Sequence, residues 1–332
     1  MLLGGVGPAV PAPGGERLEL AWPTPHPGWS AERPAMEFLQ HAGNGDPRSG
    51  GFGGVRNGGR RFHEGIDIRC LERDRRGEPL DPVMAAMAGV VRHVNAVPGR
   101  SSYGRYVVIE HPEARPAVCT LYAHLARTAP GLRAGQRVPR GHVLGVMGHS
   151  AGNYVIPKAR AHLHFEVALM VTTEFQSWYD RRKFGLPNDH GIWNGMNLMG
   201  LDPLALYDGW RAGRIHQVRD LLASSPLAVR VRIATRRAPD LVVRYPSLLQ
   251  RPRPLGLVEG WEIGFDRTGL PVAWTPLTAA EAKGLPFEQA RIVAVDEAIL
   301  RAERSRQLAL RRRGRWQVGS ELETVIQLLF GR

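Results

Sequence analysis

The chain has 332 residues, of which 43% are hydrophobic and 23% are charged. This length suits two ordinary domains, and this composition excludes a wholly disordered protein. No apolar run approaches the roughly 18 residues that a membrane-spanning helix needs, so we expect no transmembrane segment. Charge is the unusual property, because 44 basic residues against 31 acidic ones give a net charge of +13.

The positive charge favours a polyanionic partner, such as nucleic acid, anionic lipid or cell-wall polymer. Lysine occurs only at Lys158, Lys183 and Lys283, so nearly all of the cations are arginine. A GC-rich coding bias produces the same dominance of arginine, and the charge alone therefore selects no partner. No known nucleic-acid-binding module is visible, and we expect no nucleic-acid partner.

The N-terminal 60 residues are poor in regular structure. Residues 1–12 are apolar and end in a small-residue pattern that is similar to a signal-peptide cleavage site. They lack the basic start of such a signal, so a signal-peptide remnant and a floppy Gly/Pro-rich end both stay open as interpretations. Residues 13–60 are rich in Pro and Gly, which predicts an extended N-terminal arm with turns.

The next block, up to about residue 170, has a pattern of short strands separated by glycines. Apolar and β-branched residues recur at a period of two between turn residues, and no helix of normal length is visible. The predicted strands are 62–68, 83–96, 106–110, 120–125, 142–148 and 162–170. We therefore expect an all-β domain, with residues 171–210 following as a long ordered loop.

The basic C-terminal region, residues 208–332, predicts a mixed α/β structure of unknown fold. We expect a short helix over 211–223, strands within 228–275, and a helix over 296–313 whose charges suit the helix dipole. A last helix over 320–330 begins with Ser320 and Glu323, the pattern of a capping box. From position 210 onward this region has 21 basic and 12 acidic residues. It is either a solvated face or an electrostatic tether to an anionic polymer.

Five residues in three short motifs carry the candidate chemistry. His63 and Asp67 lie in FHEGIDI, His124 lies in LYAHL, and His162 and His164 lie in HLHFE. On a strand, residues two apart share a face, so His162 and His164 point the same way. One aspartate and two histidines are the ligand set of a catalytic zinc site with a fourth position left for water. Each histidine alone is more often an ordinary polar side chain, and only the joint pattern indicates a site.

The order HxxxD, YAHL and HLHFE resembles the lysostaphin/LytM-type zinc metallopeptidases of the M23 family, over about residues 61–207. The intervening segments PVMAAMAGVV, SSYGRYVVIEH, RAGQRVPRGHVLGVMGHS and NLMGLDPLALY are also similar to that family. The resemblance implies an antiparallel β-sandwich with an open groove. It also implies hydrolysis of peptide bonds in bacterial peptidoglycan, and therefore a location in the cell envelope, either periplasmic or secreted.

Carried over to this chain, the resemblance makes His63, Asp67 and His164 the ligands of one zinc ion. His124 and His162 become an unliganded catalytic pair, and which of them is the general base stays open.

Four further residues are given secondary roles. Tyr122 and Glu166 are expected to orient neighbouring site residues, although Tyr122 suits simple strand packing equally well. Cys70 and Cys119 lie near strands that should meet at the metal. We expect a disulfide between them, with a cysteine ligand to zinc as the weaker alternative.

The chain departs from the family pattern in two segments. The loop before HLHFE is longer than usual and should rim the groove. Trp178, Tyr179, Trp193 and Asn194 lie in an extension that either lines the groove or packs against the C-terminal region.

The competing functional hypothesis is a latent or non-catalytic LytM-type regulator of other wall hydrolases. The peptidoglycan bond also stays open between a D-Ala–diaminopimelate cross-link and an interpeptide bridge.

Overall fold

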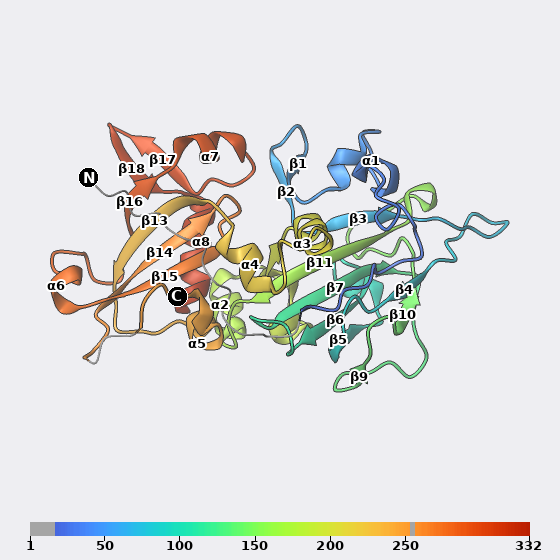
Figure 1. Cartoon of the computed structure of the whole chain (residues 1–332), viewed down its shortest axis with the longest axis horizontal. Helices are drawn as coiled ribbons and strands as arrows, with labels where there is room; N and C mark the ends of the chain where they lie inside the picture. The colour runs from blue at the N-terminus through green and yellow to red at the C-terminus, as the bar shows by residue number, and fades with distance from the viewer. Residues whose placement is uncertain (1–16, 253–255) are drawn as a thin grey trace, which may run out of the picture.

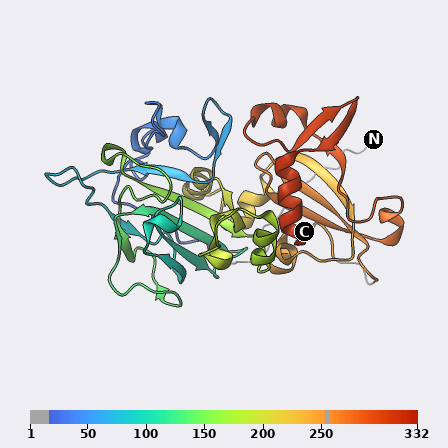
Figure 2. The same cartoon turned by 180° about the vertical axis from the view of Figure 1, so that it is seen from behind.

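The computed structural model describes residues 17–252 and 256–332, so the predicted signal-peptide remnant at 1–12 lies outside the described part. The chain folds into two lobes that lie side by side (Figures 1 and 2). We call residues 17–211 the N-terminal lobe and residues 212–332 the C-terminal lobe. In the part of the chain that is described, no helix is long and apolar enough to cross a membrane.

The N-terminal lobe is built on two antiparallel sheets. The larger has the strand order β12-β11-β7-β6-β5-β9, with β3 also paired to β11, and the smaller has the order β4-β10-β8. The strands are β2 Arg61–His63, β3 Ile66–Arg69, β4 Pro82–Met84, β5 Gly89–Asn95, β6 Arg105–His111, β7 Val118–Leu125, β8 Arg127–Thr128, β9 Arg137–Val138, β10 Val143–Val146, β11 His162–Met170 and β12 Leu198–Leu201. Because residues 61–170 contain only strands, turns and 3-10 turns, the all-β prediction is confirmed.

The first predicted strand, 62–68, is in fact two strands. β2 ends at His63 and β3 begins at Ile66. Between them, the backbone of Gly65 lies so close to β11 that an added Cβ would stand 2.3 Å from the carbonyl oxygen of Phe165. Only glycine allows this approach. The break matters because it brings His63 and Asp67 to the same site from separate strands.

The prediction of a long loop over 171–210 is wrong. This segment holds α2 Phe175–Arg182, β12 and α3 Pro203–Arg211. The start of α3 follows ordinary capping chemistry: Asp202 accepts hydrogen bonds from the backbone N–H groups of Leu204 and Ala205, at 3.0 and 3.1 Å, and Pro203 takes the first helical position. The aromatic residues of α2 are buried and stabilise the helix by packing, which the sequence pattern alone did not indicate.

Residues 17–60, the predicted N-terminal arm, have little regular structure. They hold only a four-residue helix, α1 Ala35–Phe38, a 3-10 turn and the short strand β1 Gly53–Arg56. The arm nevertheless packs firmly on the lobe. Trp22 stacks on Trp29 with ring centroids 5.3 Å apart, and both rings meet Tyr207 of α3 edge to face. This aromatic cluster packs the arm against α3 and joins it to the main hydrophobic core.

The C-terminal lobe is a four-stranded antiparallel sheet with short helices around it, which confirms the mixed α/β prediction. Its strand order is β15-β14-β13-β16. The elements are α4 Val218–Ala223, β13 Leu227–Ala234, α5 Asp240–Arg244, β14 Gly260–Asp266, β15 Pro271–Leu277, α6 Ala279–Ala282, β16 Arg291–Val295, α7 Glu297–Ala302, β17 Ala309–Arg312, β18 Arg315–Val318 and α8 Ser320–Phe330. The core of this lobe contains Trp261 and Trp274, whose ring centroids lie 5.7 Å apart, and Phe330 of α8.

Two helix predictions in this lobe need correction. The helix predicted over 296–313 ends at Ala302, and its second half is the hairpin of β17 and β18. Arg313 and Gly314 turn the hairpin with φ values of 47° and 77°, which suits a two-residue hairpin turn. The final helix is confirmed as α8, but its predicted capping box is wrong. The residue at the cap is Gly319, and the hydroxyl of Ser320 instead bonds to side chains outside the cap.

One of the contacts between the two lobes involves the hairpin of β1 and β2. Glu303 of the C-terminal lobe is buried, and it accepts hydrogen bonds from the backbone N–H of Gly54 at 3.2 Å and from Arg267 at 2.6 Å. The guanidinium of Arg306 lies 4.0 Å from the ring centroid of Phe62 on β2. We call this set of contacts the lobe clasp. It fixes the position of a hairpin that reaches directly into the site described next.

Candidate metal centre

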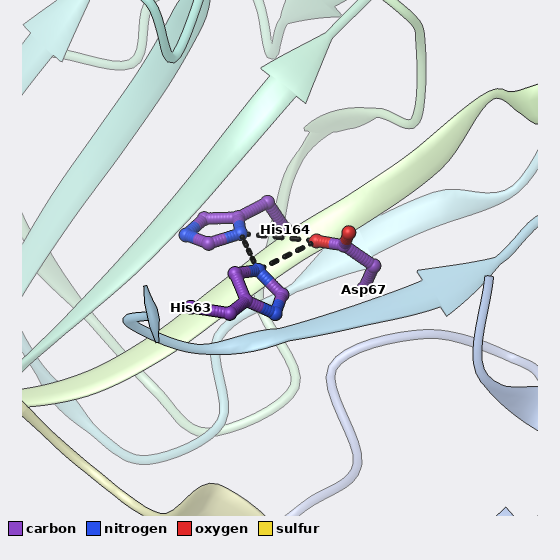
Figure 3. Close-up of side chains that lie close together, drawn as sticks. All are labelled: His63, Asp67 and His164. Atoms are coloured by element: carbon purple, nitrogen blue, oxygen red, sulfur yellow. Dashed lines mark hydrogen bonds and ion pairs between the residues drawn. The ribbon is translucent and has the colours of Figure 1, made fainter. Parts of the chain in front are cut away.

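Three buried side chains from three strands converge on one point (Figure 3). His63 ends β2, Asp67 lies on β3, and His164 lies on β11. The pairing of β3 with β11 places Asp67 directly opposite His164, so both side chains project from the same face. His63 Nε2 lies 2.9 Å from His164 Nδ1 and 3.2 Å from Asp67 Oδ1, and the remaining distance, His164 Nδ1 to Asp67 Oδ1, is 3.0 Å.

These distances suit a small tetrahedral cation. Zinc bonds to imidazole nitrogen and carboxylate oxygen are about 2.0–2.1 Å long, so neighbouring ligand atoms of a tetrahedral site lie about 3.3 Å apart. The three observed separations are slightly shorter than this. Two imidazoles and one carboxylate also form the donor set of a site that keeps one position open. The residues present therefore fit a zinc ion.

The hydrogen bonds of the two histidines leave the correct nitrogens free. His63 Nδ1–H donates to the carbonyl oxygen of Gly51 at 2.7 Å, and His164 Nε2–H donates to Glu166 at 2.7 Å. In the neutral rings, the lone pairs of His63 Nε2 and His164 Nδ1 are then directed at the shared point. Without a metal, His164 Nδ1 instead donates a proton to Asp67 Oδ1, at 3.0 Å. A carboxylate behind a metal-binding histidine is the usual way of fixing its tautomer and orientation. Glu166 thus lies where the sequence predicted an orienting residue.

Tyr103 is a residue in contact with the site that the sequence prediction missed. Its hydroxyl donates to Glu166 Oε1 at 2.7 Å, and its ring lies 5.4 Å from the ring of His164. The tyrosine lies in the SSYGRYVV segment, but nothing in the spacing connects it with β11. The expectation that Tyr122 orients the site is wrong. Its hydroxyl accepts a hydrogen bond from Ala86 N at 2.8 Å within the main core, which is the packing alternative.

His124 and His162 lie next to this group, with ring centroids 4.9 Å apart. Each Nδ1–H donates to a backbone carbonyl: that of Ser150 for His124, at 2.8 Å, and that of Arg160 for His162, at 2.7 Å. Each Nε2 is therefore the basic nitrogen, and that of His162 lies 3.5 Å from Asp67 Oδ1. His124 has a φ of 62°, a strained conformation for a residue other than glycine, which the surrounding structure holds in place.

Burial and local charges set the ionisation of the site. Burial lowers the pKa of His124 and of His162, so both rings are neutral bases at neutral pH. Burial also opposes a charge on His164, but the hydrogen bonds to Asp67 and Glu166 outweigh it and raise its pKa to about 9. Burial acts against the Asp67 carboxylate in the same way, yet the neighbouring histidines and Arg56 hold its pKa well below the ordinary value.

Arg56, the last residue of β1, is the second residue that the sequence analysis missed. Its Nη2 lies 2.5 Å from Asp67 Oδ2 and 2.8 Å from His63 Nε2. Since His63 Nδ1 is already a donor, Nε2 offers one lone pair, which can accept from Arg56 or bind a metal. The contact of Arg56 with Asp67 has no such conflict, because it uses the oxygen that does not face the histidines.

The five predicted residues share a cavity of about 610 Å³. As expected, the long loop before β11 rims it, through Tyr154, Val155 and Arg160. The extension that holds Trp178 and Tyr179 does not line this cavity. Both rings are buried in α2, which contacts α8, so packing against the C-terminal region is the correct interpretation for this pair.

The predicted disulfide is wrong, because both cysteines are free thiols. Cys119 lies on the face of β7 that packs in a small cluster with Leu121 and Ala168, whereas Cys70 packs against the main core. Cys70 Sγ donates to the carbonyl oxygen of Glu72 at 3.0 Å, and neither thiol belongs to the group of potential metal ligands.

Comparison with known proteins gives one family match. Residues 61–174 match the sequence model of the family described as Peptidase family M23. No curated protein matches the chain.

Several solved structures are similar to part of the chain. The catalytic domain of the antimicrobial peptidase lysostaphin from Staphylococcus simulans is 18% identical, over 48% of this chain and 89% of that one, with a TM-score of 0.29. A zinc containing peptidase from Vibrio cholerae is 26% identical, over 46% of this chain and 37% of that one, with a TM-score of 0.30. A lytM protein from Ruminococcus gnavus is 29% identical, over 34% of this chain and 42% of that one, with a TM-score of 0.27. The chain thus spans less than half of the last two proteins.

The all-β fold, the grouped histidines and the family match together define a hydrolase domain of the peptidase class. Within that class, residues 61–174 form a Peptidase family M23 domain, which confirms the resemblance predicted from the sequence.

Proposed function

We propose that this protein is a zinc-dependent endopeptidase that hydrolyses peptide bonds of bacterial peptidoglycan. One observation carries the proposal. Five side chains that the sequence scatters over about 100 positions line one cavity, and one ring nitrogen of each histidine is bonded outside this group of five, so that the other can bind a metal or accept a proton. An arrangement with every tautomer fixed is what a metal site with adjacent general bases requires.

His63, Asp67 and His164 are the residues that hold the ion in this proposal. A bound zinc would supply Lewis acidity at the scissile carbonyl. The chain contributes two further features: Glu166 and Tyr103 keep His164 oriented, and Arg56 stays on the outer oxygen of Asp67 after it has released His63. The positive charge of Arg56 also keeps Asp67 ionised.

His124 and His162 perform the proton transfers. Their unprotonated Nε2 atoms can accept the proton of the attacking water, and a protonated ring can then donate it to the leaving amine. The same N–H groups can hydrogen-bond the oxyanion that develops on the carbonyl. His162 is the closer of the two to Asp67, which would stabilise its protonated form, and this supports His162 as the residue that accepts the proton.

The basic composition suits this substrate. Peptidoglycan is an anionic cell-wall polymer, and a net charge of +13 would hold the enzyme close to it. The proposal places the protein in the cell envelope, periplasmic or secreted. The competing hypothesis of a non-catalytic regulator has less support, because all three candidate ligands and both histidines are present in a cavity that the N-terminal arm lines without filling.

The test is digestion of purified sacculi by the zinc-loaded protein, followed by mass spectrometry of the released muropeptides, with zinc content measured in parallel. We expect about one zinc per chain and a loss of cross-linked species. A protein that binds zinc yet leaves every cross-link intact would favour the regulator.

A further inference from the structure

The groove around the metal centre has an excess of positive charge. Three arginines line the cavity, Arg56, Arg61 and Arg160, against two acidic residues, Glu64 and Asp67. Asp67 is committed to the metal group and to Arg56. A bound divalent cation would make the balance more positive still.

Two of these arginines have no partner of their own. Within residues 17–252 and 256–332, no side-chain hydrogen bond or ion pair is made by Arg61, at the start of β2, or by Arg160, in the turn before β11. The remaining acid of the cavity, Glu64, lies 3.8 Å from Arg306 of the C-terminal lobe, so its charge is already partly balanced. Both free guanidinium groups therefore keep their full capacity for an incoming anion.

The surroundings of the arginines suit a peptide. Tyr154 and Val155 lie on the same rim with half or more of their surface exposed, and they offer apolar contact beside the charges. Arginine binds carboxylates through paired N–H donors, which gives specificity as well as affinity. A neutral glycine bridge has no side-chain group that could use these donors.

We infer that Arg61 and Arg160 select a cross-link in which a residue next to the scissile bond carries a free carboxylate, as diaminopimelate does. The inference rests on the proposed function, and it decides between the two bonds that the sequence left open. It makes both arginines specificity-determining residues, which act on the substrate and have no part in the proton transfers.

The experiment uses three synthetic cross-linked muropeptides and the full-length, zinc-loaded protein. The first has a free carboxylate on the diaminopimelate residue next to the scissile bond. The second is identical except for a carboxamide at that position, and the third is cross-linked through a glycine bridge. Binding is measured by fluorescence anisotropy, and cleavage as kcat/KM. We expect the carboxamide and the glycine-bridged peptides to bind about tenfold more weakly than the carboxylate peptide.

Variants assign this discrimination to the arginines. With Arg61→Gln or Arg160→Gln, binding of the carboxylate peptide should fall to the level of the carboxamide peptide, whose own binding should not change. Arg61→Lys and Arg160→Lys should restore part of the preference, because they keep the charge but lose the paired donors. Arg181→Gln is the matched control. It removes one exposed charge from α2, none of whose residues line the cavity, and should leave the preference intact.

The outcomes separate this inference from the proposed function. Equal binding of the carboxylate and carboxamide peptides, a preference for the glycine bridge, or no binding of any peptide would overturn the carboxylate site. Cleavage of both diaminopimelate peptides at equal rates would also overturn the carboxylate site, but it would support the proposed endopeptidase activity. Selective binding of the carboxylate peptide with no cleavage would support the carboxylate site and contradict the proposed endopeptidase function.

Discussion

The two lobes use the same kind of sheet for different purposes. Both are antiparallel, but the large sheet of the N-terminal lobe buries ionisable side chains at one end, where β3, β7 and β11 meet. The sheet of the C-terminal lobe instead buries tryptophan and phenylalanine, and among the described residues it presents no group of potential metal ligands. Buried polar groups cost free energy unless they are paired or bind something. The grouping of such side chains at one end of the large sheet is the reason for placing the proposed chemistry in the N-terminal lobe.

The largest expected effect is loss of the metal from the N-terminal lobe. His164→Ala removes one of the three proposed ligands, and zinc content should fall from about one per chain to near zero, with wall-degrading activity below detection. Elemental analysis after dialysis measures this. His162→Ala is the matched control, since it lies on the same strand and face and should keep its zinc. The opposite result would exchange the roles of the two histidines.

Loss of a catalytic histidine should separate chemistry from metal binding. His124→Ala should reduce kcat by about 10²–10⁴-fold, because one proton-transfer or oxyanion-binding group is gone, while zinc content stays near one per chain. The rate of muropeptide release and the zinc content, measured on the same sample, check it. A variant that cuts as fast as the parent protein would remove His124 from the mechanism.

The residues behind His164 should have an intermediate effect. Glu166→Gln should weaken zinc binding by about 10–100-fold, as measured by competition with a chromophoric chelator, because the carboxylate that fixes the His164 ring is lost. Tyr103→Phe should weaken it less. Tyr122→Phe removes a hydroxyl of equal size from the core and should leave zinc affinity unchanged. A larger effect from Tyr122 than from Tyr103 would contradict the assignment of orienting residues.

Outside the site, His111 should make stability depend on pH. Its ring is fully buried between the Ala88 carbonyl and the Thr120 hydroxyl, and burial lowers its pKa to about 4. Unfolding raises the pKa towards 6.5, so the unfolded chain binds the extra proton. Stability from this group is complete above pH 6.5 and falls by about 1.4 kcal/mol per pH unit as the pH drops towards 4.

Denaturant unfolding between pH 7 and pH 4.5 measures this dependence. His111→Gln keeps a buried polar side chain but cannot titrate, so it should flatten the curve in this window. An identical pH dependence in the two proteins would show that other groups control it.

The smallest expected effect comes from the lobe clasp. Glu303→Gln leaves Arg267 without its ionised partner and weakens the bond to Gly54, which should lower the free energy of unfolding by about 1–2 kcal/mol. Because the hairpin also carries Arg56, a modest rise in KM should accompany it. Glu297→Gln is the control, since its pairing with Arg301 is exposed and contributes little. If the two variants have the same free energy of unfolding and the same KM, the C-terminal lobe has no influence on the hairpin.

The histidines and the aspartate of the site could be predicted from the sequence, because residues two apart on a strand lie on the same face. His162 and His164 share a face at period two, and the remaining motifs identify their partners. The residues that contact this group from other segments could not be predicted in this way. Arg56 and Tyr103 reach the site through a hairpin and a loop whose courses depend on tertiary packing, and no local pattern marks either residue. The same limit explains two wrong predictions. The loop predicted over 171–210 contains a helix that buried aromatic residues stabilise, and the helix predicted over 296–313 is interrupted by a hairpin with a two-residue turn.

The lobe clasp has a consequence for the boundaries of this protein as a folding unit. The family match begins at residue 61, in the middle of the hairpin, so a fragment cut at that point would keep His63 and lose the strand that pairs with it. Its first strand would then be an unpaired edge at the mouth of the groove, open to pairing with another chain. The segment that matches the family is thus shorter than the set of residues that holds the hairpin in place. The match leaves out the N-terminal arm and the C-terminal lobe, which contact each other at Gly54.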